Sequence, residues 1–64
     1  MNLKNYLDKR RMTKYHLSKI SGVPKETIIS ICAGRLRIEE CSDEVVQRLA
    51  NALECTVEYV LRPE

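Results

Sequence analysis

The sequence predicts an all-α fold, a compact five-helix bundle that forms a single domain over residues 1–64. Apolar residues recur every three or four positions in five segments, which is the spacing of one helix face, and no segment alternates as a strand does. Residues that begin or end helices, such as Ser, Thr, Gly and Pro, stand between these segments. A domain of this size buries only about 60% of its unfolded surface, so the helices must pack around a thin core.

The first two helices are predicted from their apolar faces and from one capping residue. We expect the first helix over residues 2–11 and the second over residues 14–21. Thr13 precedes the second helix with the chemistry of an N-cap, because its hydroxyl can accept a hydrogen bond from a backbone N–H of the next turn. The side chains expected to face the core are Leu3, Tyr6, Leu7, Leu17 and Ile20.

A turn at Gly22 separates the second helix from a third, expected over residues 24–33. Glycine adopts positive φ without a steric cost and therefore suits the end of a helix. Pro24 suits the first position of the next helix, where its missing N–H would have no partner. The inner side of this helix carries Ile28 and Ile31 with Thr27 beside them, and the outer side carries Lys25, Glu26, Ile29, Ser30 and Ala33.

Two helices joined at a steep angle by a short turn form a helix-turn-helix, here at about residues 14–33. In this motif the second helix can enter the major groove of DNA. The segment therefore predicts DNA binding, with the helix at 24–33 as the one that meets the bases.

The remaining chain predicts a basic loop and two more helices. Gly34 ends the third helix and precedes the loop. Ser42 and Thr56 have the N-cap chemistry that begins a fourth and a fifth helix, and the fifth ends before Pro63. Acids follow Ser42 directly, where the helix dipole favours them. The loop cations are Arg35 and Arg37, and the apolar residues of the last two helices are Val45, Val46, Leu49, Ala50, Leu53, Val57, Val60 and Leu61.

Charge is distributed unevenly along the chain. The net charge is only +2, yet residues 1–37 hold nine Lys and Arg against two acids, whereas residues 38–64 hold two against seven. The basic half (1–37) therefore carries +7 and the acidic half (38–64) carries −5. A basic half on a small domain is expected of a protein that binds a polyanion. A plain solvated surface, the alternative, would usually mix its signs more evenly.

The sequence disfavours several other classes of protein. Three cysteines, at spacings of nine and fourteen residues, match no zinc or redox pattern with the single histidine, so we expect no metal, no cofactor and reduced, partly buried thiols. No nucleophile–base pair or phosphate-cradling loop suggests an enzyme. No apolar run approaches the roughly 20 residues of a membrane span, and the first residues lack a signal peptide's apolar stretch, so we expect a cytoplasmic protein. The cysteines are Cys32, Cys41 and Cys55.

A set of residues occurs in the order and spacing of a known family, without a gap from 12 to 34 and again in the last two helices. They are Met12-Thr13, Leu17-Ser18, Gly22-Val23, Thr27-Ile28, Ile31, Gly34, Leu49-Ala50, Ala52-Leu53 and Thr56-Val57. Over nearly the whole chain this order resembles the Cro and phage-repressor (XRE-type) helix-turn-helix family. The resemblance implies a lambda-repressor-like fold and a transcriptional regulator that binds operator DNA, usually as a dimer.

The resemblance also implies DNA contacts at positions of this sequence. Members of the family read bases from the first turns of the third helix, which implies Lys25, Glu26 and Ser30 here. Contacts with the DNA backbone are expected at Thr13, Lys14, Thr27, Arg35 and Arg37. The chain departs from the family pattern at three positions, with Lys14 where Gln is common, Ala33 where Asn is common and Glu54 where Gly is common.

Each base-facing residue has two interpretations. Lys25 can donate to guanine O6 and N7, or it can reach a phosphate instead. Glu26 can accept from cytosine N4, or it can simply favour the positive end of the helix dipole. Ile29 can contact a thymine methyl group, although single exposed apolar residues are ordinary. Ser30 can donate or accept and specifies little alone.

The function predicted from these features is a sequence-specific DNA-binding regulator, a repressor, rather than an enzyme. The alternative is a protein-interaction module, such as an antitoxin, whose main partner is another protein and whose docking face is the acidic half. Any homodimer is expected to use the fifth helix, through Val57, Tyr59 and Val60.

Overall fold

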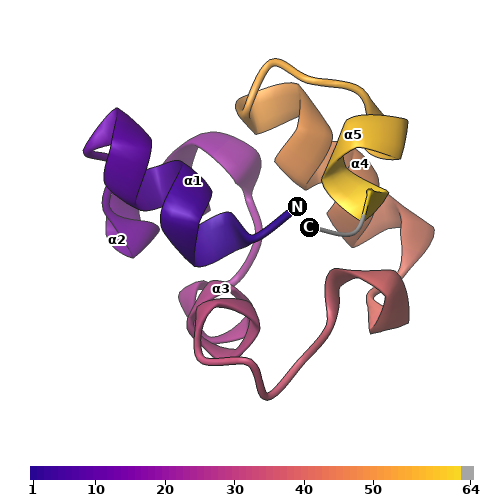
Figure 1. Cartoon of the computed structure of the whole chain (residues 1–64), viewed down its shortest axis with the longest axis horizontal. Coiled ribbons are helices and arrows are strands. Elements are labelled where there is room, and N and C mark those ends of the chain that lie inside the picture. The colour runs from indigo at the N-terminus through magenta and orange to yellow at the C-terminus, as the bar shows by residue number, and fades with distance from the viewer. Residues whose placement is uncertain (63–64) are drawn as a thin grey trace.

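The computed structural model describes residues 1–62 and contains, in that range, five α-helices and one 3₁₀ helix but no strand (Figure 1). The predicted all-α fold is therefore confirmed. Pro63, expected after the fifth helix, lies outside the described residues. None of the helices in residues 1–62 has the length and apolarity needed to cross a membrane. The elements are α1 (Leu3–Arg10), α2 (Lys14–Ser21), α3 (Lys25–Cys32), η1 (Ile38–Glu40), α4 (Asp43–Ala52) and α5 (Val57–Leu61).

Side-chain caps begin four of the helices. Thr13, Ser42 and Thr56 each accept a hydrogen bond from the backbone N–H three residues further on, as predicted, and Asn2 does the same for α1. Each such cap stabilises its helix by about 1 kcal/mol. Pro24 precedes α3 as its N-cap rather than standing inside it, so the predicted helix at 24–33 was one residue too long at each end.

Among residues 1–62, four adopt positive φ: Arg11 and Gly22 directly follow α1 and α2, and Gly34 and Glu54 each lie two residues after a helix. Gly22 (φ 74°) follows α2, and Gly34 (φ 80°) lies in the turn after α3. Glu54 (φ 57°) adopts the left-handed conformation implied by its place at a glycine position, and Arg11 (φ 54°), which was not predicted, does the same after α1. A side chain in this conformation costs about 1–2 kcal/mol, which glycine avoids.

One hydrophobic core joins all the helices. Its most buried large side chains include Leu17, Ile28, Leu49 and Leu53, each 0% exposed. α2 packs against both α3 and α4, α1 packs against α3, and α5 packs against α4 and η1. In Figure 1, α1–α3 form one side of the molecule and η1, α4 and α5 form the other, with the chain start beside α5. There the amino group of Met1 donates to the Val60 carbonyl at 3.3 Å.

The inward face of α2 differs from the prediction at one position. Ile20 was expected in the core, but it is 47% exposed, and Ser21 is buried in its place at 7%. At about 100° per residue, Ser21 and Ile20 flank Leu17 on opposite sides of the helix. α2 packs against α3 and α4, and in this packing the Ser21 side is buried while Ile20 turns toward solvent.

η1 is the second difference, because the sequence predicts only a loop at this place. Its single turn carries Ile38 into the core at 4% exposure. The backbone N–H of Arg37 donates to Glu40 Oε1 at 3.0 Å, which fixes the start of the turn. The loop after α3 is therefore anchored at its far end.

Candidate nucleic-acid interface

The turn between α2 and α3 is fixed by hydrogen bonds and by one buried side chain. Ser18 Oγ donates to the Val23 carbonyl at 2.7 Å, and the Val23 N–H donates to Ser21 Oγ at 3.1 Å. The Val23 side chain is 1% exposed. The Ser18 hydroxyl therefore forms part of the turn. These contacts hold the start of α3 at a set position relative to α2.

α3 presents its first turn to solvent. Ile28 and Ile31 are buried as predicted, and they hold the helix against the core. Of the residues predicted to face outward, Lys25, Glu26 and Ala33 are exposed, whereas Ile29 and Ser30 are only half-buried. Thr27, predicted beside the inner face, is half-buried as well. Ile29 therefore offers a base only part of its side chain, less than its predicted place on the outer face implies.

The predicted backbone-contacting residues lie around the ends of α2 and α3. Thr13 caps α2 and Lys14 is its first residue, and both are exposed. Arg35 and Arg37 are exposed in the loop between α3 and η1. Cys32, the last residue of α3, lines two pockets: one also contains Thr13 and Lys14, the other Arg37. The end of α3 therefore lies between Lys14 and Arg37.

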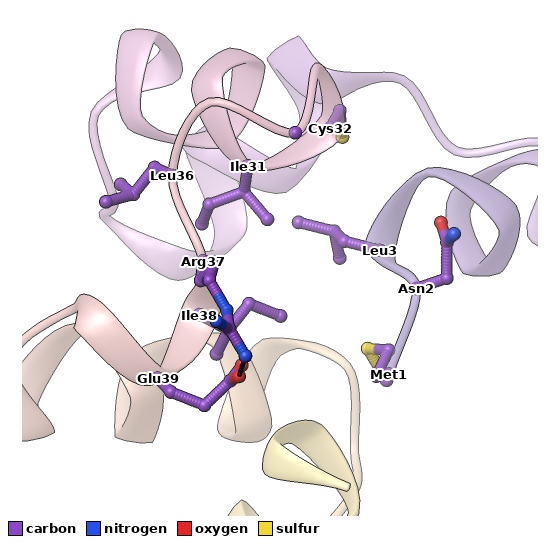
Figure 2. Close-up of a pocket in the computed structure, with 10 residues that line it drawn as sticks. Met1, Asn2, Leu3, Ile31, Cys32, Leu36, Arg37, Ile38 and Glu39 are labelled. Carbon is purple, nitrogen blue, oxygen red and sulfur yellow. Dashed lines mark hydrogen bonds and ion pairs between the residues drawn. The ribbon is translucent and has the colours of Figure 1, made fainter. Parts of the chain in front are cut away.

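The two loop cations differ in their surroundings. Arg37 Nη2 lies 3.1 Å from Glu39 Oε2, in an ion pair at the rim of a pocket of about 240 Å³ (Figure 2). A hydrogen bond from its own backbone N–H, and then Arg37, hold the pKa of the Glu39 carboxyl below its usual range. Arg35 has no ion pair within residues 1–62. Arg35 is thus available to a phosphate as it stands, whereas Arg37 must leave its carboxylate.

The basic and acidic halves of the sequence lie on different sides of the folded molecule. The cations of residues 1–37 are all exposed, and they come from α1–α3 and the segments that follow α1 and α3. The acids of η1 and α4 and those flanking them belong to the other side of the molecule (Figure 1). The exposed cations of the basic half are Lys4, Lys9, Arg10, Arg11, Lys14, Lys19, Lys25, Arg35 and Arg37.

The arrangement matches a known kind of DNA-binding domain. A family model of the Cro/C1-type helix-turn-helix DNA-binding domain matches residues 2–63. The chain belongs to this family. Searches of curated proteins and of solved structures found no match. The resemblance inferred from the sequence is therefore confirmed, and this Cro/C1-type domain is a DNA-binding domain.

The cysteines of this Cro/C1-type domain are free and half-buried, as predicted. Burial raises the pKa of all three thiols, which leaves them mainly protonated near neutral pH. No group of three or more metal-binding side chains occurs among residues 1–62.

Sequence reasoning missed one part of the surface, a pocket of about 400 Å³ between α1, the start of α2 and the end of α3. It brings Lys4 and Asp8 of α1 beside Thr13 and Lys14. In the sequence, Lys4 is only one cation on the outer side of an amphipathic helix. The spacing of four residues between Lys4 and Asp8 places them on one flank, but only the packing of α1 shows what that flank faces.

Proposed function

We propose that this Cro/C1-type domain is a sequence-specific transcriptional regulator, acting as a repressor, that inserts α3 into the major groove of an operator. One observation carries the proposal: α3 exposes Lys25 and Glu26 in its first turn while Ile28 anchors the helix in the core. A rigid helix with a polar, exposed first turn is the arrangement that presents side chains to base edges. The domain acts by binding, without a catalytic step.

Base reading is assigned to the outer residues of α3. Lys25 donates to guanine or to a phosphate, and Glu26 accepts from cytosine N4. Ser30 adds a hydrogen bond, and the exposed part of Ile29 contacts a thymine methyl group. The half-burial of Ile29 and Ser30 supports a larger share of specificity for Lys25 and Glu26.

Affinity comes mainly from the DNA backbone. Backbone contacts are assigned to Thr13 and Lys14 at the start of α2, to Thr27 on α3, and to the loop residues Arg35 and Arg37. If about six cations engage phosphates, log K falls with log salt at a slope of about −5.

A homodimer would place two copies of α3 on successive turns of a pseudo-palindrome, about 34 Å apart. The predicted dimer surface on α5 requires one correction. Val60 is 1% exposed because it belongs to the core, and it has almost no surface left for a partner. The remaining predicted residues on α5 are Tyr59, which is 44% exposed, and the half-buried Val57.

The proposal is tested by selecting binding sites from a random duplex library and measuring the winner against scrambled DNA at two salt concentrations. We expect a pseudo-palindromic sequence that binds much more tightly than scrambled DNA. No enrichment, or equal and weak binding to every sequence, would contradict the proposal.

A second candidate function is favoured by a pocket of about 250 Å³ in the acidic half. Val46, Val57 and Leu61 line it together with Glu39 and Asp43. An apolar groove with an acidic rim suits a basic, amphipathic protein segment, as in a module whose main partner is a protein. Failure of the duplex selection together with stable co-purification of a basic partner would favour this second function.

A further inference from the structure

The pocket between α1, α2 and α3 has the walls of an anion site. Lys4 and Asp8 come from α1, Thr13 and Lys14 from the start of α2, and Cys32 from the end of α3. Leu7, which is 3% exposed, and Met12 add apolar walls. With a volume of about 400 Å³, the pocket has ample room for a phosphodiester group.

The ammonium groups of Lys4 and Lys14 affect the electrostatic environment of the Cys32 thiol, which lines the same pocket. Burial raises the pKa of the Cys32 thiol most; Lys14 then lowers it, Asp8 raises it, and Lys4 lowers it least. Both lysines are therefore close enough to the thiol for their charges to reach it. Two lysines against one aspartate leave the walls with one net positive charge.

A comparison with the pocket in Figure 2 separates this site from the rest of the basic surface. There the cation, Arg37, is already paired with Glu39 at 3.1 Å. Lys4 and Lys14 form no ion pair within residues 1–62, so an incoming anion would displace no carboxylate from them. An exposed lysine without a partner can neutralise a phosphate directly and so release the cations condensed on the DNA.

We propose that this pocket, which we call the Lys4–Lys14 notch, receives a backbone phosphate of the bound duplex, and that Lys4 of α1 is a DNA-backbone contact. The inference rests on the proposed function, because the notch includes Thr13 and Lys14, which that function places against the DNA backbone. It adds α1 to the interface. A phosphate held between α1 and α2 fixes the duplex to both helices that flank α3.

The first experiment measures how duplex affinity depends on salt in three variants. Lys4→Ala removes one phosphate contact, so the slope of log K against log salt becomes shallower by about 0.9, and affinity at 0.1 M salt falls about eightfold. Lys4→Arg keeps the charge and restores both quantities. Lys9→Ala is the matched control, because Lys9 is an exposed lysine of the same helix that does not line the notch.

The second experiment uses the cysteines as reporters of occupancy. Maleimide labelling of the wild-type protein, with and without the selected duplex, gives a rate for each thiol. We expect the duplex to slow labelling of Cys32, while Cys41 and Cys55, also half-buried but outside the notch, keep their rates. Inorganic phosphate at matched ionic strength is the free-anion control.

The outcomes distinguish this inference from the proposed function. Tight, specific DNA binding with equal slopes for wild type, Lys4→Ala and Lys9→Ala would overturn the role of Lys4 and leave the proposed function standing. So would an unchanged Cys32 rate in the bound protein, or protection by inorganic phosphate but not by duplex. If the wild-type protein selects no duplex, the proposed function and this inference fail together.

Discussion

The basic and acidic halves of the molecule are built alike inside and differently outside. Each half uses capped helices, and each contributes fully buried leucines to one shared core, Leu17 on one side and Leu49 on the other. Their surfaces carry opposite charges. The two halves thus share one hydrophobic core, but they differ in surface charge. That charge distinguishes the side that can bind DNA.

The two halves also differ in how they treat a cation. Arg48 on α4 lies 2.8 Å from Glu44 one turn earlier, so the acidic half neutralises one of its two arginines. Lys14, Lys25 and Arg35 in the basic half have no such partner within residues 1–62. A cation that a phosphate can recruit is one without a neighbouring carboxylate, and the basic half keeps most of its cations in that state.

The strongest test of the shared core is to break it from each side. Leu17→Ala and Leu49→Ala should each lower the free energy of unfolding by about 2–5 kcal/mol, because both side chains are 0% exposed. Urea unfolding followed by far-UV circular dichroism and by tyrosine fluorescence measures this. Transitions that fail to coincide between the two probes would show that the halves unfold separately.

Matched charge changes should affect the two halves unequally. Arg35→Ala and Gln47→Glu each lower the net charge by one, at exposed positions of the basic and acidic halves respectively. Removing the loop cation should weaken duplex binding about eightfold at 0.1 M salt and make the salt slope shallower by about 0.9. Adding the acid on α4 should leave the slope unchanged. Equal slopes for the two variants would mean that only total charge matters.

A comparison of two equivalent helix caps, one in each half, should distinguish an effect on stability from an effect on DNA binding. Thr13→Ala and Ser42→Ala each remove a hydroxyl that accepts a hydrogen bond in the first turn of its helix, so each should cost about 1 kcal/mol of stability. The loss at Thr13 should also weaken DNA binding, because that residue starts α2 at the proposed interface. Thermal unfolding and duplex titration on the same samples provide the comparison. A binding loss at Ser42 as large as that at Thr13 would remove the distinction.

The smallest expected effect lies at the border between the halves. Glu39→Gln releases Arg37 from its exposed ion pair, and we expect duplex affinity to rise about two- to fivefold, since surface pairs are weak. The lowered pKa of Glu39 means that the carboxylate persists until the pH falls below the usual glutamate range, and only then does acid release Arg37 as the variant does. Weaker binding by the variant at neutral pH would show that Glu39 orients Arg37 rather than competing for it.

Helix ends were predictable because they depend on neighbouring residues alone. Thr13, Ser42 and Thr56 cap their helices through contacts three residues away, and Gly22 supplies the positive φ at the end of α2. The left-handed conformation of Glu54 followed from the family pattern. Most of the residues proposed to meet DNA were predicted from their places relative to the residues that carry the family resemblance, such as Gly22 and Ile28.

Burial and neighbourhood were decided only by the tertiary structure, because they depend on which elements pack together. Sequence spacing predicted Ile20 in the core, but the packing of α2 against its neighbours buries Ser21 instead. The same packing leaves Val60 too buried for a dimer surface and brings Lys4 of α1 beside Lys14 of α2. The sequence by itself therefore determined the helices and their family, whereas the packing of α1, α2 and α3 decided which cations share a pocket. Electrostatic interactions depend on the distance between charges in space, and the separation of two residues along the sequence does not give that distance.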